Sequence, residues 1–267
     1  MPDSRSLALI TGASSGLGEV FARKLASRKW NLILVARREE RLRELKLELE
    51  KSGDVSVDVI PADLSNPEDI ARTAAHIRGL PSLDLLINNA GFGTKGLFWD
   101  VPIEHHVEMH QVHVMAILQL MHAALQGMVR RDHGAIINVS SVAAYARSPG
   151  AANYCATKGW INDISEGIYQ DLAVRKSKVQ IQSLCPGFTY TEFHEAMGVS
   201  RDPIPSWLWL SAGFVVDESL QALEDRKLFV IPSLKYRLAA SFLSKIPTAL
   251  RLRVERGSPH SKTRIEK

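Results

Sequence analysis

Three polar side chains could together move a proton: Ser141, Tyr154 and Lys158. Tyr154 and Lys158 stand four residues apart near the start of a predicted helix, so their side chains share one helix face. An ammonium group beside a phenol favours the phenolate, which makes proton exchange possible near neutral pH. Ser141 follows a predicted strand and could face the same cleft. A lone Tyr/Lys pair is more often a surface contact, but this setting predicts a general acid–base site.

A glycine-rich turn follows the first predicted strand and precedes a predicted helix that opens at Glu19. Glycines in such a turn bring backbone N–H groups close to a pyrophosphate, and the start of the helix favours an anion. The spacing is G-x-x-x-G-x-G, not the commoner G-x-G-x-x-G, and the alternative is a flexible surface loop. The turn predicts phosphate binding by Gly12, Ser14, Ser15, Gly16, Leu17 and Gly18.

The second predicted strand ends in Ala36, Arg37 and Arg38, with no carboxylate to bind an adenosine ribose 2′-hydroxyl. Guanidinium groups suit a 2′-phosphate instead, because they bind it through charge-assisted hydrogen bonds. The strand end therefore predicts NADP(H) as the cofactor. The alternative is that both arginines only begin the charged face of the next helix.

Short apolar runs alternate with longer helical patterns, which predicts βαβ units and a parallel sheet. The predicted fold class is α/β, a doubly wound, Rossmann-like parallel sheet of about seven strands with helices on both faces. The first, fourth and fifth runs are apolar on both faces and predict central strands, whereas the third alternates and predicts a place near an edge. In such a sheet, ligands bind outside the carboxyl ends of the strands. The predicted strands are 7–10, 32–35, 55–60, 83–87, 135–139, 179–184 and 228–231, and the predicted helices are 19–29, 39–51, 67–78, 102–131, 153–176 and 217–226.

Composition limits the class of protein. The chain has 267 residues, of which 45% are hydrophobic and 23% charged, so a packed core is expected and global disorder is excluded. Two cysteines are too few for a disulfide scaffold, and neither a signal peptide nor a membrane span is expected, which predicts a cytoplasmic protein. We expect one dinucleotide-binding catalytic domain over residues 1–234, including a substrate lid at 192–216, and a basic extension over 235–267.

Six motifs, in order, resemble those of the short-chain dehydrogenase/reductase family, from about Leu7 to Thr191. Each is common alone, but six in this order are very specific. The resemblance implies one Rossmann-like domain with strand order 3-2-1-4-5-6-7, a nicotinamide cofactor, and hydride exchange between a carbonyl and an alcohol. The motifs are TGASSGLG at 11–18, Asp63-Leu64, Asn88-Asn89-Ala90-Gly91, Ser140-Ser141, Tyr154 with Lys158, and PGFTYT at 186–191.

The resemblance also implies a role for each matching residue. Tyr154 would protonate the carbonyl oxygen, Ser141 would hydrogen-bond the same oxygen, and Lys158 would hold the nicotinamide ribose and depress the tyrosine pKa. The remaining cofactor contacts implied are Asp63 and Leu64 at the adenine, Asn89 with Ala90 and Gly91 near the adjoining ribose, and Pro186, Gly187, Thr189 and Thr191 at the carboxamide. The family resemblance further implies a homodimer or homotetramer through the helices at 102–131 and 153–176.

His113 stands where the family usually has an Asn that supports a proton relay. Imidazole can itself pass protons, so we expect His113 to be tolerated or to participate in catalysis. His106 and His110 share its helix face, and such spacing can bind zinc. No cysteine or acidic partner accompanies the pattern, so we expect a solvated or subunit-facing histidine stripe and no metal site.

The region after Thr191 is apolar and predicts an apolar carbonyl or alcohol as substrate, although its tryptophans could instead pack the lid onto the core. The apolar wall would come from Phe193, Met197, Trp207 and Trp209. The extension carries nine Lys or Arg and two Glu. It predicts either an amphipathic helix packed on the domain or a partner subunit, or contact with an anionic membrane, which is the less common case. No nucleic-acid-binding pattern is present.

These observations predict an NADP(H)-dependent oxidoreductase that transfers a hydride between the nicotinamide and a small-molecule carbonyl or alcohol. Two alternatives remain at this point. The chain could be a dinucleotide-binding sensor or scaffold without turnover, which the His113 departure motivates. It could also be a membrane-peripheral interaction protein that acts through the basic extension.

Overall fold

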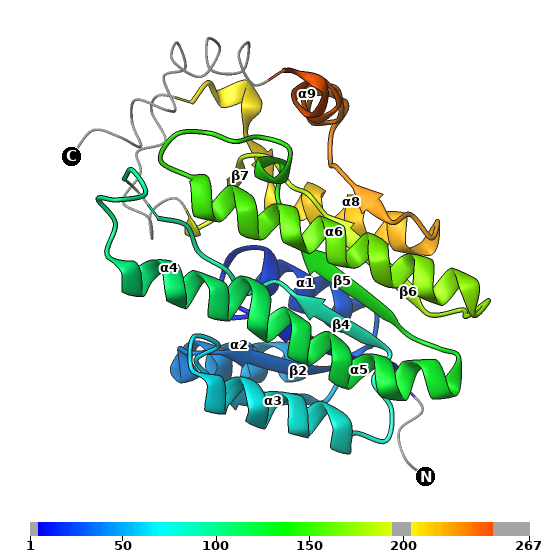
Figure 1. Ribbon diagram of the computed structural model, residues 1–267. Helices are drawn as coiled ribbons and strands as arrows, with labels where there is room; N and C mark the ends of the chain where they lie inside the picture. The colour runs from blue at the N-terminus through cyan, green and yellow to red at the C-terminus, as the bar shows by residue number, and fades with distance from the viewer. Residues whose placement is uncertain (1–4, 95, 194–203, 248–267) are drawn as a thin grey trace.

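A seven-stranded parallel sheet forms the centre of the molecule, with helices on both faces (Figure 1). The computed structural model describes residues 5–94, 96–193 and 204–247. The strand order is β3-β2-β1-β4-β5-β6-β9, which confirms the predicted class and order. The strands are β1 Leu7–Thr11, β2 Asn31–Ala36, β3 Val57–Pro61, β4 Leu85–Asn88, β5 Ala135–Val139, β6 Gln180–Leu184 and β9 Phe229–Val230. The main helices are α1 Gly16–Ser27, α2 Glu39–Ser52, α3 Pro67–Gly79, α4 Ile103–His110, α5 Ile117–Arg131, α6 Ala152–Val174, α8 Ala212–Glu224 and α9 Leu234–Lys245.

The polarity of each strand explains its place in the sheet. β4 and β5 are buried at every position, as central strands covered on both faces must be. β3 begins with buried Val57 and exposed Asp58, continues with half-buried residues, and lies at the edge of the sheet. The predictions of central and edge strands are therefore confirmed.

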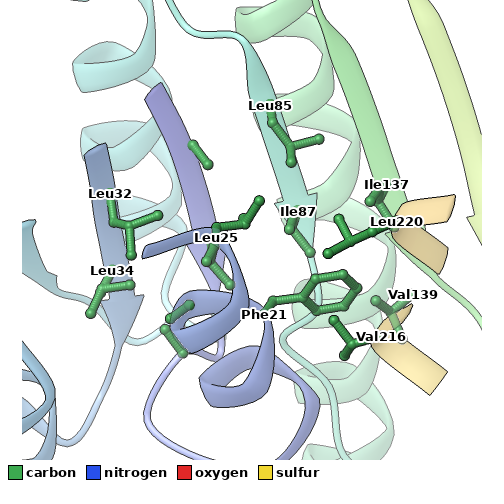
Figure 2. Packing of buried hydrophobic residues seen from close by; sticks show 14 of the residues in the cluster. Phe21, Leu25, Leu32, Leu34, Leu85, Ile87, Ile137, Val139, Val216 and Leu220 are labelled. Carbon is green, nitrogen blue, oxygen red and sulfur yellow. The ribbon is translucent and has the colours of Figure 1, made fainter. Parts of the chain in front are cut away.

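Two apolar layers hold the helices on the sheet. On one face, Phe21 of α1 is fully buried among side chains from β4, β5 and α8, including Ile87, Val139 and Val216 (Figure 2). On the other face, α3, α5 and α6 pack against the sheet through residues such as Ile70. A side chain the size of phenylalanine buried in such a layer contributes about 1.5–3 kcal/mol by leaving water. These layers fix the strand ends from which the site is built.

The predicted helix at 102–131 contains one irregular turn. A π-helical segment at Gln111–Ala116 joins α4 to α5. Such insertions are rare and frequently lie at functional sites. The whole stretch Ile103–Arg131 has the length and mean hydropathy of a membrane span, but half of its most apolar window is buried inside the protein. Because Leu120 and Met128 pack in the second apolar layer, we interpret it as a core helix.

A second, two-stranded sheet was not predicted. β7 Thr189–Tyr190 pairs in parallel with β8 Leu210–Ser211, and a 3₁₀ turn at Ser206–Leu208 precedes β8. Two-residue strands are too short to leave a periodic signal in the sequence. The pairing ties the two ends of the predicted lid together beside the sheet.

Candidate active site

A large cleft lies along the carboxyl ends of the central strands. Its volume is about 750 Å³. Gly18 and His113 are the two predicted site residues that do not line it; they lie behind its wall. The predicted residues that line it are Gly12, Ser14, Ser15, Gly16, Leu17, Arg37, Arg38, Asp63, Leu64, Asn89, Ala90, Gly91, Ser141, Tyr154, Lys158, Pro186, Gly187, Thr189 and Thr191.

Lys158 and Tyr154 lie in the first two turns of α6, and both are buried. The Lys158 Nζ atom donates a 2.8 Å hydrogen bond to the Val139 carbonyl at the end of β5 and lies 5.7 Å from the centre of the Tyr154 ring. Burial lowers the pKa of Lys158 to about 8. The lysine is thus held between the tyrosine and the strand end, where a change of its charge near neutral pH acts on both.

Ser141, which follows the end of β5, lines the same cleft as Tyr154 and Lys158. Its oxygen accepts a 3.1 Å hydrogen bond from the Ala143 N–H at the start of a 3₁₀ turn, so its own proton can be donated into the cleft. The neighbouring Ser140, which sequence reasoning missed as a support, donates a 2.8 Å hydrogen bond to the Lys158 carbonyl. Two hydrogen bonds therefore join the end of β5 to the start of α6, one donated by Ser140 and one donated by Lys158. They hold the catalytic candidates on these two elements in fixed positions relative to one another.

The glycine turn forms the opposite end of the cleft. Gly12 adopts a φ of 65°, and a Cβ there would lie 2.9 Å from the Ala90 Cα and the Asn89 side chain. Glycine is the residue that accepts this conformation without strain. Gly18 does not face the cleft, because it packs against the Gly12 carbonyl and lets α1 approach the turn. The N–H groups of the first turn of α1 are left to face an anion.

The family model for short chain dehydrogenases matches residues 6–201. The chain belongs to the short-chain dehydrogenase/reductase family. It is 35% identical over 189 residues to nodulation protein G of Rhizobium sp. (strain N33), which covers 68% of this chain and 72% of that protein. Its family membership and its relatives show that the protein is a nicotinamide-dependent oxidoreductase acting on CH–OH or C=O groups.

Two solved structures of the same family are similar along most of the chain. A short-chain dehydrogenase from Sphingobium yanoikuyae in complex with NADPH superimposes with a TM-score of 0.82 at 31% identity, covering 91% of this chain and 97% of that chain. The bulky-bulky ketone specific alcohol dehydrogenase from Comamonas testosteroni gives a TM-score of 0.78 at 28% identity, covering 92% and 97%.

The residues of this short-chain dehydrogenase fit a nicotinamide dinucleotide. The glycine turn at the start of α1 supplies a cradle that a Cβ would fill, and buried Lys158 stands at the other end of the same cleft. A Cβ atom at position 187 would lie 2.1 Å from the Tyr236 ring. Only glycine therefore fits at this position in the wall of the cleft.

Arg38 lies beside the glycine turn and lines the cleft. Its guanidinium donates to the Ser14 hydroxyl at 3.1 Å and to the Glu192 carboxylate at 3.1 Å. Arg41 binds the same carboxylate at 2.8 Å, and these two arginines hold the pKa of Glu192 below its usual range. Arg37 is exposed, 4.0 Å from Asp63. The sequence analysis did not predict a role for Glu192 and Arg41. They are 151 residues apart in the chain, and only the fold brings α2 next to the start of the predicted lid.

His113 lies in the π-helical segment and is fully buried. Its Nε2 atom accepts a 3.1 Å hydrogen bond from the Phe92 N–H, so the neutral ring carries its proton on Nδ1 and donates it to the Thr157 hydroxyl at 2.9 Å. That hydroxyl in turn donates to the Tyr154 carbonyl at 3.0 Å. Burial first, and then the charges of Lys158 and His110, lower the pKa of His113 well below its usual range.

The other histidines of this stretch have separate partners. The His106 Nε2 atom lies 3.0 Å from the Phe98 carbonyl, and the His110 Nε2 atom lies 2.8 Å from the Asn153 side chain. No group of three possible metal ligands occurs within residues 5–94, 96–193 and 204–247. His106 and His110 each make a hydrogen bond to a neighbouring segment of the fold.

The apolar wall differs from the predicted one. Phe193 lines the cleft, with its ring centre 6.0 Å from that of Tyr154. Trp209 does not line it; it is buried and stacks on Tyr190 at 4.9 Å, so it packs the lid onto the core. Trp207 is exposed at the surface, and Met197 lies outside the described residues.

The first helix of the predicted extension contributes to the site. The Tyr236 hydroxyl accepts a hydrogen bond from the Phe188 N–H and donates one to the Leu208 carbonyl at 2.7 Å. Leu243 of the same helix lines the cleft. The boundary expected at residue 234 thus falls at the first turn of α9, whose buried face joins the main core. The spacing of Tyr236, Ala240 and Leu243 on one helix face was the signal that could have revealed this.

Proposed function

We propose that the protein is an NADP(H)-dependent oxidoreductase that transfers a hydride between the nicotinamide and the carbonyl or alcohol group of a bulky apolar substrate. The observation that carries this proposal is the placing of Ser141, Tyr154 and Lys158 at one end of a cleft whose other end presents Arg37 and Arg38. The NADPH complex and the bulky-ketone specificity named for the two similar structures support it.

The residues divide the chemistry between them. In the direction of reduction, the Tyr154 hydroxyl donates a proton to the substrate's carbonyl oxygen, and the Ser141 hydroxyl donates a hydrogen bond to the same oxygen. Both act more strongly in the transition state than in the ground state, because negative charge develops on that oxygen. The Lys158 ammonium, 5.7 Å from the Tyr154 ring centre, stabilises the phenolate that remains. When bound, the nicotinamide supplies the hydride.

The substrate class is tested by an NADPH-consumption assay on ketones of equal reactivity but different side groups. We expect kcat/KM to be greatest for bulky apolar ketones and about tenfold or more lower for 2-oxo acids, because Phe193 and Leu243 offer apolar contacts and no cation. A preference for charged 2-oxo acids would contradict this part of the proposal.

We expect Glu192→Gln to tighten NADPH binding about two- to fivefold and to leave NADH binding unchanged, because an exposed ion pair that a 2′-phosphate must displace is worth up to about 1 kcal/mol. The dissociation constants come from fluorescence titration. Glu39→Gln is the matched control, since Glu39 pairs with Arg43 on an exposed face of α2 and does not line the cleft. Equal tightening for NADH would place the effect outside the 2′-phosphate corner.

We propose that His113 participates as a positioning residue, because both of its ring nitrogens are engaged and its ring is neutral. His113→Phe leaves the half-buried Phe92 N–H without its acceptor, which costs about 1–3 kcal/mol, and should lower kcat about tenfold or more. His113→Asn restores an acceptor and should recover much of the loss. The pH profile of kcat between 5 and 7 should not change in either variant. A new limb in that range, or an increase in turnover of orders of magnitude for His113→Asn, would contradict this role.

A sensor without turnover is the less favoured function, since the complete Ser, Tyr and Lys set is held in one cleft. Cys155 and Cys185 are buried thiols, and so low a cysteine content supports a cytoplasmic location. Exposed Ile103, Val107 and Leu118 on α4 and α5 support a homodimer or homotetramer through this helical face.

A further inference from the structure

α9 has two different faces and lies at the outer edge of the molecule (Figure 1). Tyr236 and Ala240 are buried on the inner face, and Leu243 lines the cleft. Leu234, Leu238 and Phe242 lie one turn apart on the opposite face and are 64%, 63% and 64% exposed. We call these three residues the outer stripe. A helix that only covered the domain would have no need of large apolar side chains on this face.

Trp207 extends the apolar surface at the start of α9. Its side chain is 66% exposed, and the Lys235 ammonium lies over its ring, 5.8 Å from the ring centre. Lys235 also donates a hydrogen bond to the Trp207 carbonyl, so the tryptophan is fixed beside the helix. Tryptophan with a neighbouring cation is typical of the boundary between water and lipid headgroups.

The charges around the outer stripe are positive. By helical spacing, Lys235 and Arg237 lie on either side of the stripe, and Lys245 lies near its end, while α9 has no acidic residue. Arg237 forms an ion pair with Glu218 of α8, with 4.0 Å between the guanidinium nitrogen and the carboxylate oxygen. An apolar stripe bordered by cations is complementary to an anionic bilayer, into which the apolar groups insert while the cations stay at the headgroups.

We propose that the outer stripe of α9, together with Trp207, docks the protein on an anionic lipid surface and holds the mouth of the cleft against it. The inner face of the same helix lines the cleft, so a substrate dissolved in the bilayer would enter beside Leu243. The docking itself does not depend on the proposed reaction. The proposed occupant of the outer stripe is the lipid surface. The competing possibility, that a second copy of this chain covers the stripe, is tested below.

The test is flotation of the full chain with vesicles. Wild-type protein should float with phosphatidylglycerol/phosphatidylcholine vesicles at low salt, and at least tenfold less with phosphatidylcholine alone. The double variant Leu238→Glu with Phe242→Glu should reduce binding to the anionic vesicles at least tenfold. Leu47→Glu, at an equally exposed leucine of α2, is the matched control and should bind as the wild type does. Unchanged melting temperatures show that the variants fold.

A second measurement addresses contact and the competing occupant. Anionic vesicles should shift the tryptophan emission to shorter wavelength, and Trp207→Phe should remove most of that shift. Sedimentation velocity should give the same oligomeric state for the wild type and the double variant. The proposal is overturned if the wild type does not bind anionic vesicles, if the double variant binds them equally well, or if the double variant separates a wild-type oligomer into monomers.

Discussion

Tyr154→Phe should lower kcat for carbonyl reduction by about three orders of magnitude, because the variant keeps the ring and loses the proton donor. The dissociation constant for NADPH should change less than about threefold, since the phenol is one contact among many along the cleft. Steady-state NADPH consumption and a separate binding titration measure the two quantities. Loss of turnover with binding retained would exclude a purely binding function.

Tyr145→Phe is the control for this variant. Tyr145 lies four residues after Ser141, and its hydroxyl is 4.0 Å from the Cys185 sulfur, not in the lining of the cleft. Burial raises the pKa of Tyr145, so it stays protonated and takes no part in proton transfer. It should keep most of the activity. A Tyr154→Phe enzyme with more than a tenth of wild-type kcat would show that another group donates the proton.

Lys158→Met should abolish most activity and at the same time stabilise the protein. At pH 7 and below, the buried amine is charged in both the native and the unfolded state, and the cost of burying that charge is fully present. The lowering of the pKa of Lys158 from 10.5 to about 8 corresponds to about 3 kcal/mol, of which the lost hydrogen bond to Val139 takes back about 1 kcal/mol. The expected net gain in unfolding free energy is about 2 kcal/mol.

The gain should depend on pH in a defined direction. Between about pH 8 and 10.5 the unfolded state binds the proton that the native state has lost, so wild-type stability rises with pH in this window. The advantage of Lys158→Met should therefore shrink from pH 8 upwards by about 1.4 kcal/mol per pH unit, disappear near about pH 9.5 and reverse by pH 10.5, where only the loss of the hydrogen bond to Val139 remains. Among the groups that face the amine, burial lowers the pKa of the His113 ring and raises that of the Cys185 thiol, so both are uncharged at pH 7. The centre of the Tyr154 ring lies 5.7 Å from the amine. Denaturant unfolding without nucleotide measures the difference, and a variant less stable than the wild type at pH 7 would contradict it.

The sequence indicated the sheet and the ends of its strands well, because these depend on local patterns. The apolar runs at β1, β4 and β5 marked the central strands, and the glycine turn and Ser141 follow two of them directly. In a parallel sheet the carboxyl ends lie on one side, so residues following such strands gather without any knowledge of their contacts.

Contacts between distant segments were not predictable in this way. The position of His113 departs from the family, but only the fold shows that Phe92 and Thr157 engage both ring nitrogens. Glu192 meets Arg38 across more than 150 residues of chain. Tyr236 was assigned to a separate extension; its spacing with Ala240 and Leu243 indicates a buried helix face, but only the fold shows that its hydroxyl joins α9 to Phe188 and Leu208.

The most direct test of the central claim is a fluorescence titration of the purified protein with NADPH and, separately, with NADH. The account predicts that NADPH binds at least about tenfold more tightly, since an additional charge-assisted contact to the 2′-phosphate at Arg38 is worth about 1.5–3 kcal/mol. Arg38→Ala should remove most of that difference. Equal or tighter binding of NADH would contradict the cofactor assignment, and a folded protein that binds neither nucleotide would contradict the proposed reaction itself.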